Sequence, residues 1–232
     1  MTTATLLTVR KRVGLLTGEI VGRFQKGYLK DESHAVAALA RLRRGAGKEA
    51  LCVPDLWNLV DTRPLHERPQ DGGRPLREDE LIRAEDSVHV ALTLWALHQQ
   101  SRGTGMHRSD SRKSPAGLGA AVRRLMPPGD IAEPVLKRLV RAGNAPDLPA
   151  LASRLRDIVL LLRREDIALD YALLAEQLYQ WQETGGRDPV RRAWGRSFHA
   201  YRPDDEDTGD GPSAAASDQP VLSADTIDKD AL

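Results

Sequence analysis

The stretch DLPALASRLRDIVLLLRREDIALDYALLAEQLYQW, residues 147–181, decides the fold class of this chain. Its apolar residues recur every three or four positions, which is the period of an amphipathic helix and not the alternation of a strand. Asp147 and Asp170 each precede such a run and are suited to cap a helix N-terminus. The stretch therefore predicts one helix from 147 to about 164 and a second from 170. Their expected inward faces are Leu151, Leu155, Ile158 and Leu162 in the first, and Leu174, Leu178 and Trp181 in the second.

The same helical period continues on both sides of this stretch, and no segment alternates convincingly as a strand. Ser33 and Ser114 are expected N-caps, and the Pro127-Pro128-Gly129 turn is expected to end the helix before it. We therefore predict an all-α protein of eight or nine helices, arranged as two packed helical bundles. The further helices are predicted at about 6–24, 33–45, 54–60, 78–101, 115–126, 131–142 and 188–198.

Two patterns within these helices predict how they pack. Glycines at 14, 18 and 22 are spaced four residues apart, which favours the close approach of a second helix backbone. In helix 33–45, the expected buried stripe is Val36, Leu39 and Leu42. The tryptophans Trp57, Trp95, Trp181 and Trp194 all fall on apolar stripes, so they are expected in the core and not on a base-stacking surface.

Composition divides the chain into four parts. Residues 1–101 are predicted to form an N-terminal helical bundle and residues 116–202 a C-terminal one, separated by a mobile basic loop at 102–115. Residues 61–77 are rich in Pro, Gly and Arg and are expected to form a long loop. Residues 203–232 are acidic and nearly free of bulky apolar side chains, which predicts a disordered tail.

The net charge of +1 conceals a strong asymmetry. Residues 1–202 contain 33 Lys and Arg against 24 Asp and Glu, whereas residues 203–232 contain one Lys and nine Asp and Glu. A basic body with an acidic tail is typical of a polyanion-binding protein. An excess of Arg over Lys, 27 to 7, also fits a GC-rich genome, so charge alone leaves nucleic-acid binding open. The tail either competes with DNA for the basic face or stays solvated and inert, and we favour the second.

The sequence contains no set of residues suited to catalysis or to metal binding. None of the six histidines stands at metal-ligand spacing with another His, Cys or carboxylate. Cys52 is the single cysteine, which excludes an internal disulfide and suits a reducing cytoplasm. No apolar run approaches the length of a membrane span, and no signal peptide is expected. We therefore expect a cytoplasmic protein that is not an enzyme and has no cofactor.

The remaining signal is a set of arginine-rich clusters on the predicted helices. A cation near a helix C-terminus also stabilises the helix dipole, so each residue taken alone has a structural explanation. Several clusters on one small body favour contacts with phosphates, which depend strongly on salt and weakly on sequence. The clusters are Arg41, Arg43 and Arg44; Lys137, Arg138 and Arg141; and the pairs Arg123-Arg124, Arg163-Arg164 and Arg191-Arg192.

Four short motifs and one longer segment, taken together over about residues 10–200, resemble the CasB family. The motifs are Leu-Arg-Arg-Gly at 42–45, Leu-His-Gln at 97–99, Gly-Leu-Gly at 117–119 and Trp-Gly-Arg-Ser-Phe at 194–198, and the segment is 161–181. Each motif is short, and their order and spacing make the set specific. The chain departs from the family in its long 61–77 and 101–115 loops and in its acidic tail.

The CasB family supplies the small subunit of Cascade, the type I-E CRISPR surveillance complex of antiviral defence. The resemblance implies a noncatalytic, two-bundle helical subunit, present as two copies placed head to tail. The implied partners are the crRNA-bearing backbone subunits, the large subunit, and the target and displaced DNA strands, whose R-loop the basic surface would stabilise while guide pairing reads the sequence. The implied DNA-facing residues are Arg41, Arg43, Arg44, Lys137, Arg138, Arg141, Arg154, Arg156, Arg187, Arg191 and Arg192.

Two other classes of protein remain open at this point. A helical transcription regulator would need a recognition helix that presents base-reading side chains, and no clear one is found. A helical adaptor that binds only proteins would use its arginines as solubilising charge. Salt-dependent binding to random-sequence DNA separates the adaptor from the Cascade subunit, and preference for one palindromic site favours the regulator.

Overall fold

The structure is a computed structural model that describes residues 7–48, 53–56, 58–68, 74–111 and 114–201. These residues confirm the all-α prediction, because they form nine α-helices and no strand, with one isolated bridge between His107 and Leu169. The elements are α1 (Val9–Leu29), α2 (Ser33–Gly45), the 3₁₀ turn η1 (Pro54–Leu56), α3 (Arg63–His66), α4 (Glu78–Gln99), α5 (Leu118–Arg124), α6 (Glu133–Gly143), α7 (Leu148–Arg164), α8 (Tyr171–Gln182) and α9 (Arg187–Ala200).

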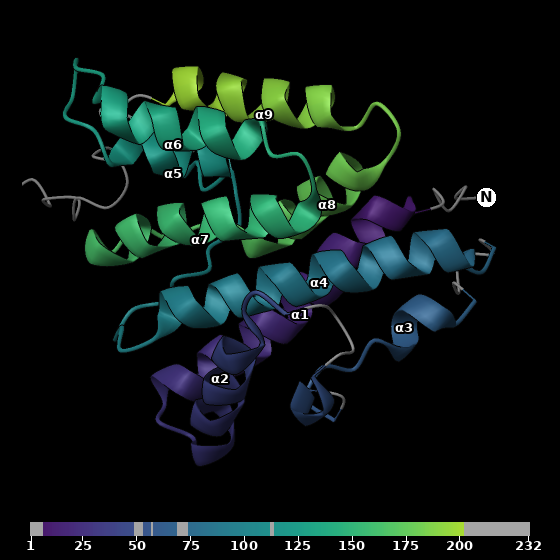
Figure 1. Cartoon of the computed structure of the whole chain (residues 1–232). Helices are drawn as coiled ribbons and strands as arrows, with labels where there is room; N and C mark the ends of the chain where they lie inside the picture. The colour runs from purple at the N-terminus through teal and green to yellow at the C-terminus, as the bar shows by residue number, and fades with distance from the viewer. Residues whose placement is uncertain (1–6, 49–52, 57, 69–73, 112–113, 202–232) are drawn as a thin grey trace, which may run out of the picture.

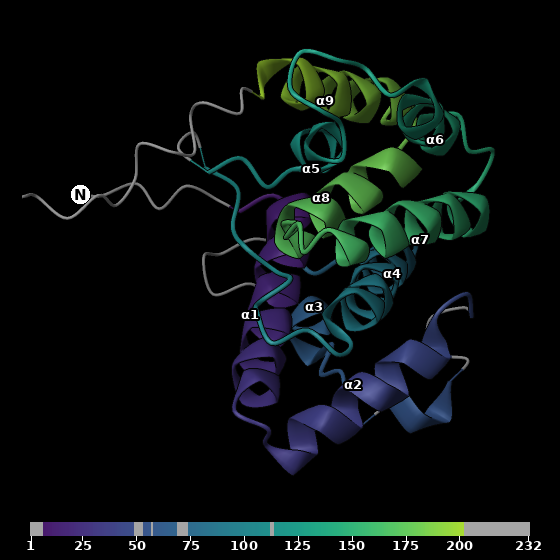
Figure 2. The same ribbon diagram turned by 90° about the vertical axis from the view of Figure 1, so that its left-hand side faces the viewer.

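The helices are stacked in layers. Figure 2 shows α9 with α5 and α6 at one end of the molecule, α8 and α7 below them, then α4 and α1, and α2 at the opposite end. Helix α8 contacts α1, α4 and α9, so it connects the helices of the N-terminal half to those of the C-terminal half. One continuous core of buried side chains runs through both halves, and α4 at its centre buries residues around most of its circumference.

The stretch that predicts the fold forms the two expected helices. The Asp147 carboxylate accepts a hydrogen bond of 2.8 Å from the Ala150 N–H at the start of α7. Asp170 accepts one of 2.9 Å from the Leu173 N–H at the start of α8. All seven predicted inward residues of α7 and α8 are buried, so both caps and both faces are confirmed.

Helix α1 packs closely against α8, as two of the three spaced glycines predict. A β-carbon at Gly14 would overlap the Glu176 side chain, and one at Gly18 would lie 3.2 Å from the Ala172 β-carbon. Gly22 faces open space, so the predicted close approach is wrong at this third position. The Glu176 carboxylate that fills the space over Gly14 accepts a 2.9 Å hydrogen bond from Lys11.

Several predicted helix boundaries are wrong. Helix α1 begins after its cap Thr8 and continues beyond Phe24 to Leu29, since Gln25, Lys26 and Leu29 are good helix formers. In α2, Glu32 and not Ser33 is the N-cap, and Val36 is 38% exposed, while Ala35 and Ala38 face the core instead. The predicted helix at 54–60 is only the turn η1, and the 61–77 loop contains the short helix α3, whose Leu65 is buried.

The segment 102–111 makes hydrogen bonds to three helices. Gln25 of α1 accepts from the His107 N–H at 2.8 Å and donates to the His107 carbonyl at 3.0 Å. Gln99 of α4 accepts from the N–H of Met106, whose side chain is buried. Asp170 at the start of α8 accepts from the Asp110 N–H at 2.7 Å.

The same contacts explain why α5 begins at Leu118 and not at Pro115. The Asp110 carboxylate accepts hydrogen bonds from the N–H groups of Ala116 and Gly117, at 2.6 and 2.8 Å. The Ala116 carbonyl accepts from the Asp170 N–H at 2.8 Å, which keeps residue 116 outside the helix. Gly117, and not Ser114, is therefore the N-cap of α5.

Candidate nucleic-acid interface

The predicted basic residues fall at two opposite ends of the molecule. The cluster of Arg41, Arg43 and Arg44 lies on α2, whereas the remaining predicted residues lie on α6, α7 and α9 at the other end (Figure 1). All three α2 arginines are exposed. Arg44 lies 3.7 Å from the Asp55 carboxylate, and Arg41 and Arg43 have no partner among the described residues.

Helix α6 presents its predicted cluster on a solvent-facing side. Lys137 pairs with Glu133 one turn earlier, at 2.8 Å. Arg138 is exposed and makes a long hydrogen bond of 3.4 Å to the Pro134 carbonyl, and Arg141 is exposed without a carboxylate partner among the described residues. Val140, between them, is 52% exposed, so this face combines cations with one apolar side chain.

Three predicted arginines converge on the C-terminal end of α6: two donate hydrogen bonds to its last backbone carbonyls, and the third donates to a carbonyl in the connection to α7. Arg154 of α7 donates to the Arg141 carbonyl, and Arg191 of α9 donates to the Gly143 carbonyl at 2.6 Å. Arg187 donates to the Pro146 carbonyl at 2.8 Å, and its guanidinium lies 4.3 Å from the centre of the Trp181 ring. The Arg141 and Gly143 carbonyls are among those that a helix end leaves without partners, so Arg154 and Arg191 connect α7 and α9 to the end of α6, while Arg187 holds α9 to the α6–α7 connection.

As Arg191 does in its pair, one member of each of the other two predicted arginine pairs donates to a backbone carbonyl. Arg123 donates to the Pro127 carbonyl at 3.1 Å just beyond α5, and Arg163 donates to the Gln100 carbonyl at 3.0 Å just beyond α4. Arg123 and Arg163 therefore also have a structural role, as hydrogen-bond donors to backbone carbonyls. Of the predicted cations on α6, α7 and α9, those that remain exposed with neither a carboxylate nor a carbonyl of another element as partner among the described residues are Arg138, Arg141, Arg156, Arg164 and Arg192.

Sequence reasoning missed one member of this group, Arg196. It stands one turn after Arg192 on the exposed side of α9, and it has no partner among the described residues. His199 follows on the same side and is also exposed. The four-residue spacing of Arg192 and Arg196 was a usable signal.

The family-like motifs lie at helix contacts. A β-carbon on Gly119 would overlap the Trp194 carbonyl and the Ser197 hydroxyl, so the Gly-Leu-Gly motif on α5 contacts the Trp-Gly-Arg-Ser-Phe motif on α9 directly. Gln99 of Leu-His-Gln holds the 102–111 segment, and Gly45 of Leu-Arg-Arg-Gly packs against Leu56. The motifs therefore specify how the helices fit together.

The buried polar groups near α8 belong to this packing. His98 is fully buried, with its Nδ1 at 2.8 Å from the Tyr171 hydroxyl, and burial lowers its pKa to about 3. The Tyr171 N–H donates to His107 Nδ1 at 3.1 Å, and burial also lowers the pKa of His107. Both rings are thus neutral near pH 7 and serve as hydrogen-bond partners.

Three of the four tryptophans are in the core, as predicted. Trp95, Trp181 and Trp194 are at most 2% exposed, and Trp194 Nε1 donates to the Gln177 side-chain oxygen at 2.7 Å. Trp57, Cys52 and the acidic tail lie outside the described residues. In the part of the chain that the structure describes, no group of three or more His, Cys, Asp or Glu is placed to hold a metal ion. Over the same residues, no helix combines the length and hydropathy that a membrane span requires.

The chain is similar to a known protein family and to solved structures. The family model for CRISPR-associated protein Cse2 matches residues 38–199. The crystal structure of CasB from Thermobifida fusca is 50% identical, with a TM-score of 0.71, and the match covers 81% of this chain and 98% of that chain. No curated protein matches the chain.

Two more distant solved structures share the fold. CasB from Thermus thermophilus is 21% identical with a TM-score of 0.54, and the match covers 78% of this chain and 98% of that chain. A chain of a CRISPR RNA-guided surveillance complex is 19% identical with a TM-score of 0.54, and the match covers 81% of this chain and 95% of that chain. The family model spans well over half of the sequence, and the similarity that the motifs predicted is confirmed. The chain belongs to the CRISPR-associated protein Cse2 family, also known as CasB.

Proposed function

We propose that this chain is the noncatalytic small subunit of a type I-E Cascade complex, and that it binds nucleic acid through its basic surface and stabilises the R-loop. Membership of the Cse2 family supports the assignment to the complex. The proposed partners are the crRNA-bearing backbone subunits, the large subunit and a second copy of this chain. In this arrangement base pairing with the guide reads the sequence, and the small subunit supplies positive charge along the strands.

The observation that carries the nucleic-acid part of the proposal is the group of exposed cations on α6, α7 and α9. Five of the predicted cations in this group have no carboxylate partner among the described residues: Arg138, Arg141, Arg156, Arg164 and Arg192. Three others at the same end donate hydrogen bonds to backbone carbonyls: Arg154, Arg187 and Arg191. A guanidinium without a carboxylate partner is free to contact a phosphate. Because the described tryptophans are buried, binding is expected to be through phosphates and not through stacked bases.

The test is a salt series of binding to labelled random-sequence single-stranded and double-stranded DNA. The affinity should fall linearly on a log–log scale as salt rises, with no preference for one sequence. In the variant R138E/R141E the slope should be smaller by about 2, one for each lost phosphate contact. Circular dichroism should show an unchanged helical content, since both side chains are exposed.

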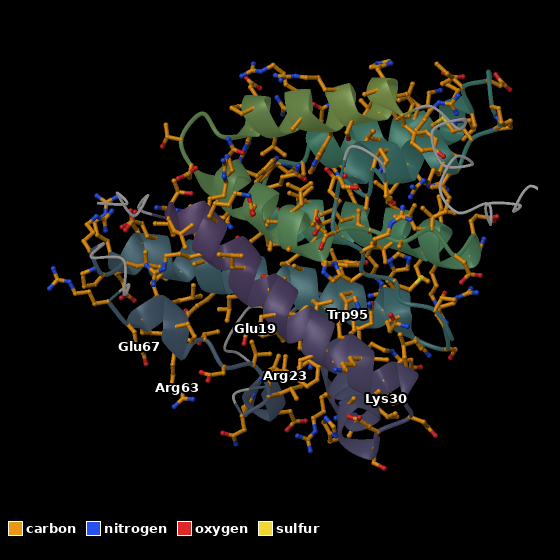
Figure 3. The ribbon with its side chains drawn as sticks, turned by 180° about the vertical axis from the view of Figure 1, so that it is seen from behind. Glu19, Arg23, Lys30, Arg63, Glu67 and Trp95 are labelled. Carbon is orange, nitrogen blue, oxygen red and sulfur yellow. The ribbon has the colours of Figure 1, made fainter. Side chains whose placement is uncertain are left out.

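A matched control separates the α6 surface from net charge. Lys26 and Lys30 are exposed at the end of α1, next to α2, and Figure 3 shows Lys30 there. The variant K26E/K30E changes the net charge by the same amount as R138E/R141E, at the other end of the molecule. It should keep most of the parent affinity. An equal loss in both variants would show that net charge and not the α6 surface sets affinity, and absence of binding at low salt would favour a protein-only subunit.

A further inference from the structure

The C-terminal end of the described chain lies beside unpaired positive charge. Arg192, Arg196 and His199 are exposed along one side of α9, and we call these three residues the α9 stripe. Neither arginine of the stripe has a partner among the described residues. Asp188, the one carboxylate on this side of the helix, pairs with Arg191 at 3.0 Å.

The point at which the chain leaves the body is fixed. The Arg124 guanidinium at the end of α5 lies 5.2 Å from the centre of the Tyr201 ring, directly after the last residue of α9. Residues 202–232 therefore start within one helical turn of His199. A segment that starts here is attached next to the α9 stripe, so its groups have a high effective concentration at that surface.

The sequence that follows is complementary to the stripe in charge. Residues 203–232 contain nine acidic residues and one Lys, against a net charge of +9 for residues 1–202. Five of the nine acids come within the first eight positions after Arg202. We call these five the proximal acids; they are Asp204, Asp205, Glu206, Asp207 and Asp210.

The reach of the segment is sufficient. The 14 residues of α9 rise about 1.5 Å each, so the helix is about 21 Å long. Eight extended residues span up to about 26 to 29 Å, so a chain that turns back at residue 202 brings the proximal acids past the whole stripe. The distal acids, at 218, 225, 228 and 230, are separated from the stripe by a longer connection and have a lower effective concentration there.

We infer that the proximal acids bind the α9 stripe within the same molecule and compete with nucleic acid for it. The contact between the proximal acids and the α9 stripe is independent of the proposed function. The competition with nucleic acid rests on the proposed function. The inferred contact differs from the expectation of an inert tail because the chain leaves the body next to the α9 stripe. Competition of this kind lowers affinity most at low salt, where unscreened charges attract over longer distances.

The contact is tested without nucleic acid. In a full-length chain carrying Cys52→Ser and Ser213→Cys, a nitroxide label on residue 213 should broaden the backbone amide NMR signals of Arg192 and Arg196 at low salt. The broadening should disappear at high salt and in the variant D204N/D205N/D207N/D210N carrying the same label. Unbroadened α9 signals at low salt in the labelled parent would overturn the inference.

Competition is tested by two full-length variants with the same change in charge. D204N/D205N/D207N/D210N neutralises four proximal acids, and D218N/D225N/D228N/D230N neutralises the four distal ones. The proximal variant should bind random-sequence DNA several-fold more tightly than the parent at about 50 mM salt, and the gain should shrink by about 200 mM. Adding R192Q/R196Q should remove most of the gain.

The outcomes separate the two proposals. An equal gain in the proximal and distal variants would mean that net charge alone acts, and this would overturn the competition. If none of the chains binds DNA at low salt, the proposed function fails, while the NMR experiment still decides whether the contact exists.

Discussion

Gly119 shows how much one residue contributes to this fold. Its missing side chain lets α5 lie against the backbone of α9 at Trp194 and Phe198, where any β-carbon would overlap the neighbouring atoms. The indole of Trp194 then lies in the core and donates a hydrogen bond to Gln177 of α8. A small residue and a large one thus bring three helices together.

Truncation of Trp194 should therefore be costly. We expect Trp194→Ala to lower the free energy of unfolding by roughly 3–5 kcal/mol, because it leaves a cavity in the core and removes the partner of the Gln177 oxygen. Trp194→Phe should cost less, since it keeps most of the packing and loses only the hydrogen bond. Urea unfolding followed by circular dichroism measures both. Equal losses for the two variants would show that the hydrogen bond, not the packing, dominates.

His98 predicts a pH dependence of stability. Burial lowers its pKa to about 3 in the folded protein, against about 6.5 when unfolded, so below pH 6.5 the unfolded state binds the proton more readily. Stability is then complete above pH 6.5 and falls as the pH decreases, by up to about 1.4 kcal/mol per pH unit for this residue. Between pH 7 and 5 the change in stability comes mainly from the histidines. The buried carboxylate Glu80 has a pKa of about 2 in the folded state, against 4.5 ordinarily, so its own effect on stability develops mainly below pH 4.5.

The measurement is the free energy of unfolding at several pH values between 7 and 5. His98→Gln should reduce the decrease but not abolish it, since burial also lowers the pKa of His107 and of His89. His34→Gln is the matched control, because the His34 side chain is 69% exposed, and it should leave the decrease unchanged. A parent stability that does not vary between pH 7 and 5 would contradict the assignment.

At the scale of helices, the two aspartate caps of the central stretch make different contributions. Asp147 is exposed and caps α7 only, so Asp147→Ala should cost about 1 kcal/mol. Asp170 is buried, caps α8 and also accepts from the Asp110 N–H. Asp170→Ala should cost clearly more, because it also leaves the backbone donor of Asp110 without its acceptor. Equal losses in urea unfolding would mean that the Asp110 contact contributes nothing.

The same comparison explains which elements could be predicted from the sequence. Helices α7 and α8 begin where the sequence places them because a cap and an apolar period are local features. The start of α5 was missed because Asp110 accepts from the N–H groups of residues 116 and 117. Asp170, 60 residues after Asp110, donates to the Ala116 carbonyl and accepts from the Asp110 N–H. Val36 was misplaced because the small residues Ala35 and Ala38 allow closer packing than a larger side chain.

The candidate site was less predictable than the fold, also for a physical reason. Residue spacing identified cations, but it did not show which of them donate to carbonyls of another helix. Arg154, Arg187 and Arg191 acquire such partners only once α7 and α9 reach the end of α6. Arg138 and Arg192 have the same local character in the sequence and stay exposed.

At the scale of the molecule, the position of α8 bears on the predicted division at residues 102–115. Helix α8 belongs to the C-terminal half of the chain, yet it packs against α1 and α4 of the N-terminal half. Its buried residues Leu174 and Leu178 are part of the same core as Val88 and Leu92 of α4. Residues 1–101 alone would expose this apolar surface to water, which is unfavourable in proportion to its area.

We therefore expect the whole chain to unfold in one cooperative transition, although it is long enough to contain two small domains. Urea unfolding followed by circular dichroism should coincide with unfolding followed by tryptophan fluorescence, since Trp95 and Trp194 lie in different halves of the one core. The variants W57F/W181F/W194F and W57F/W95F/W181F keep only Trp95 and only Trp194, respectively, so each reports on one half, and both should give the same midpoint as circular dichroism of the same variant. Two separate midpoints within one variant would show that the halves unfold independently, and that the segment 102–111, for all its hydrogen bonds, marks a true domain boundary.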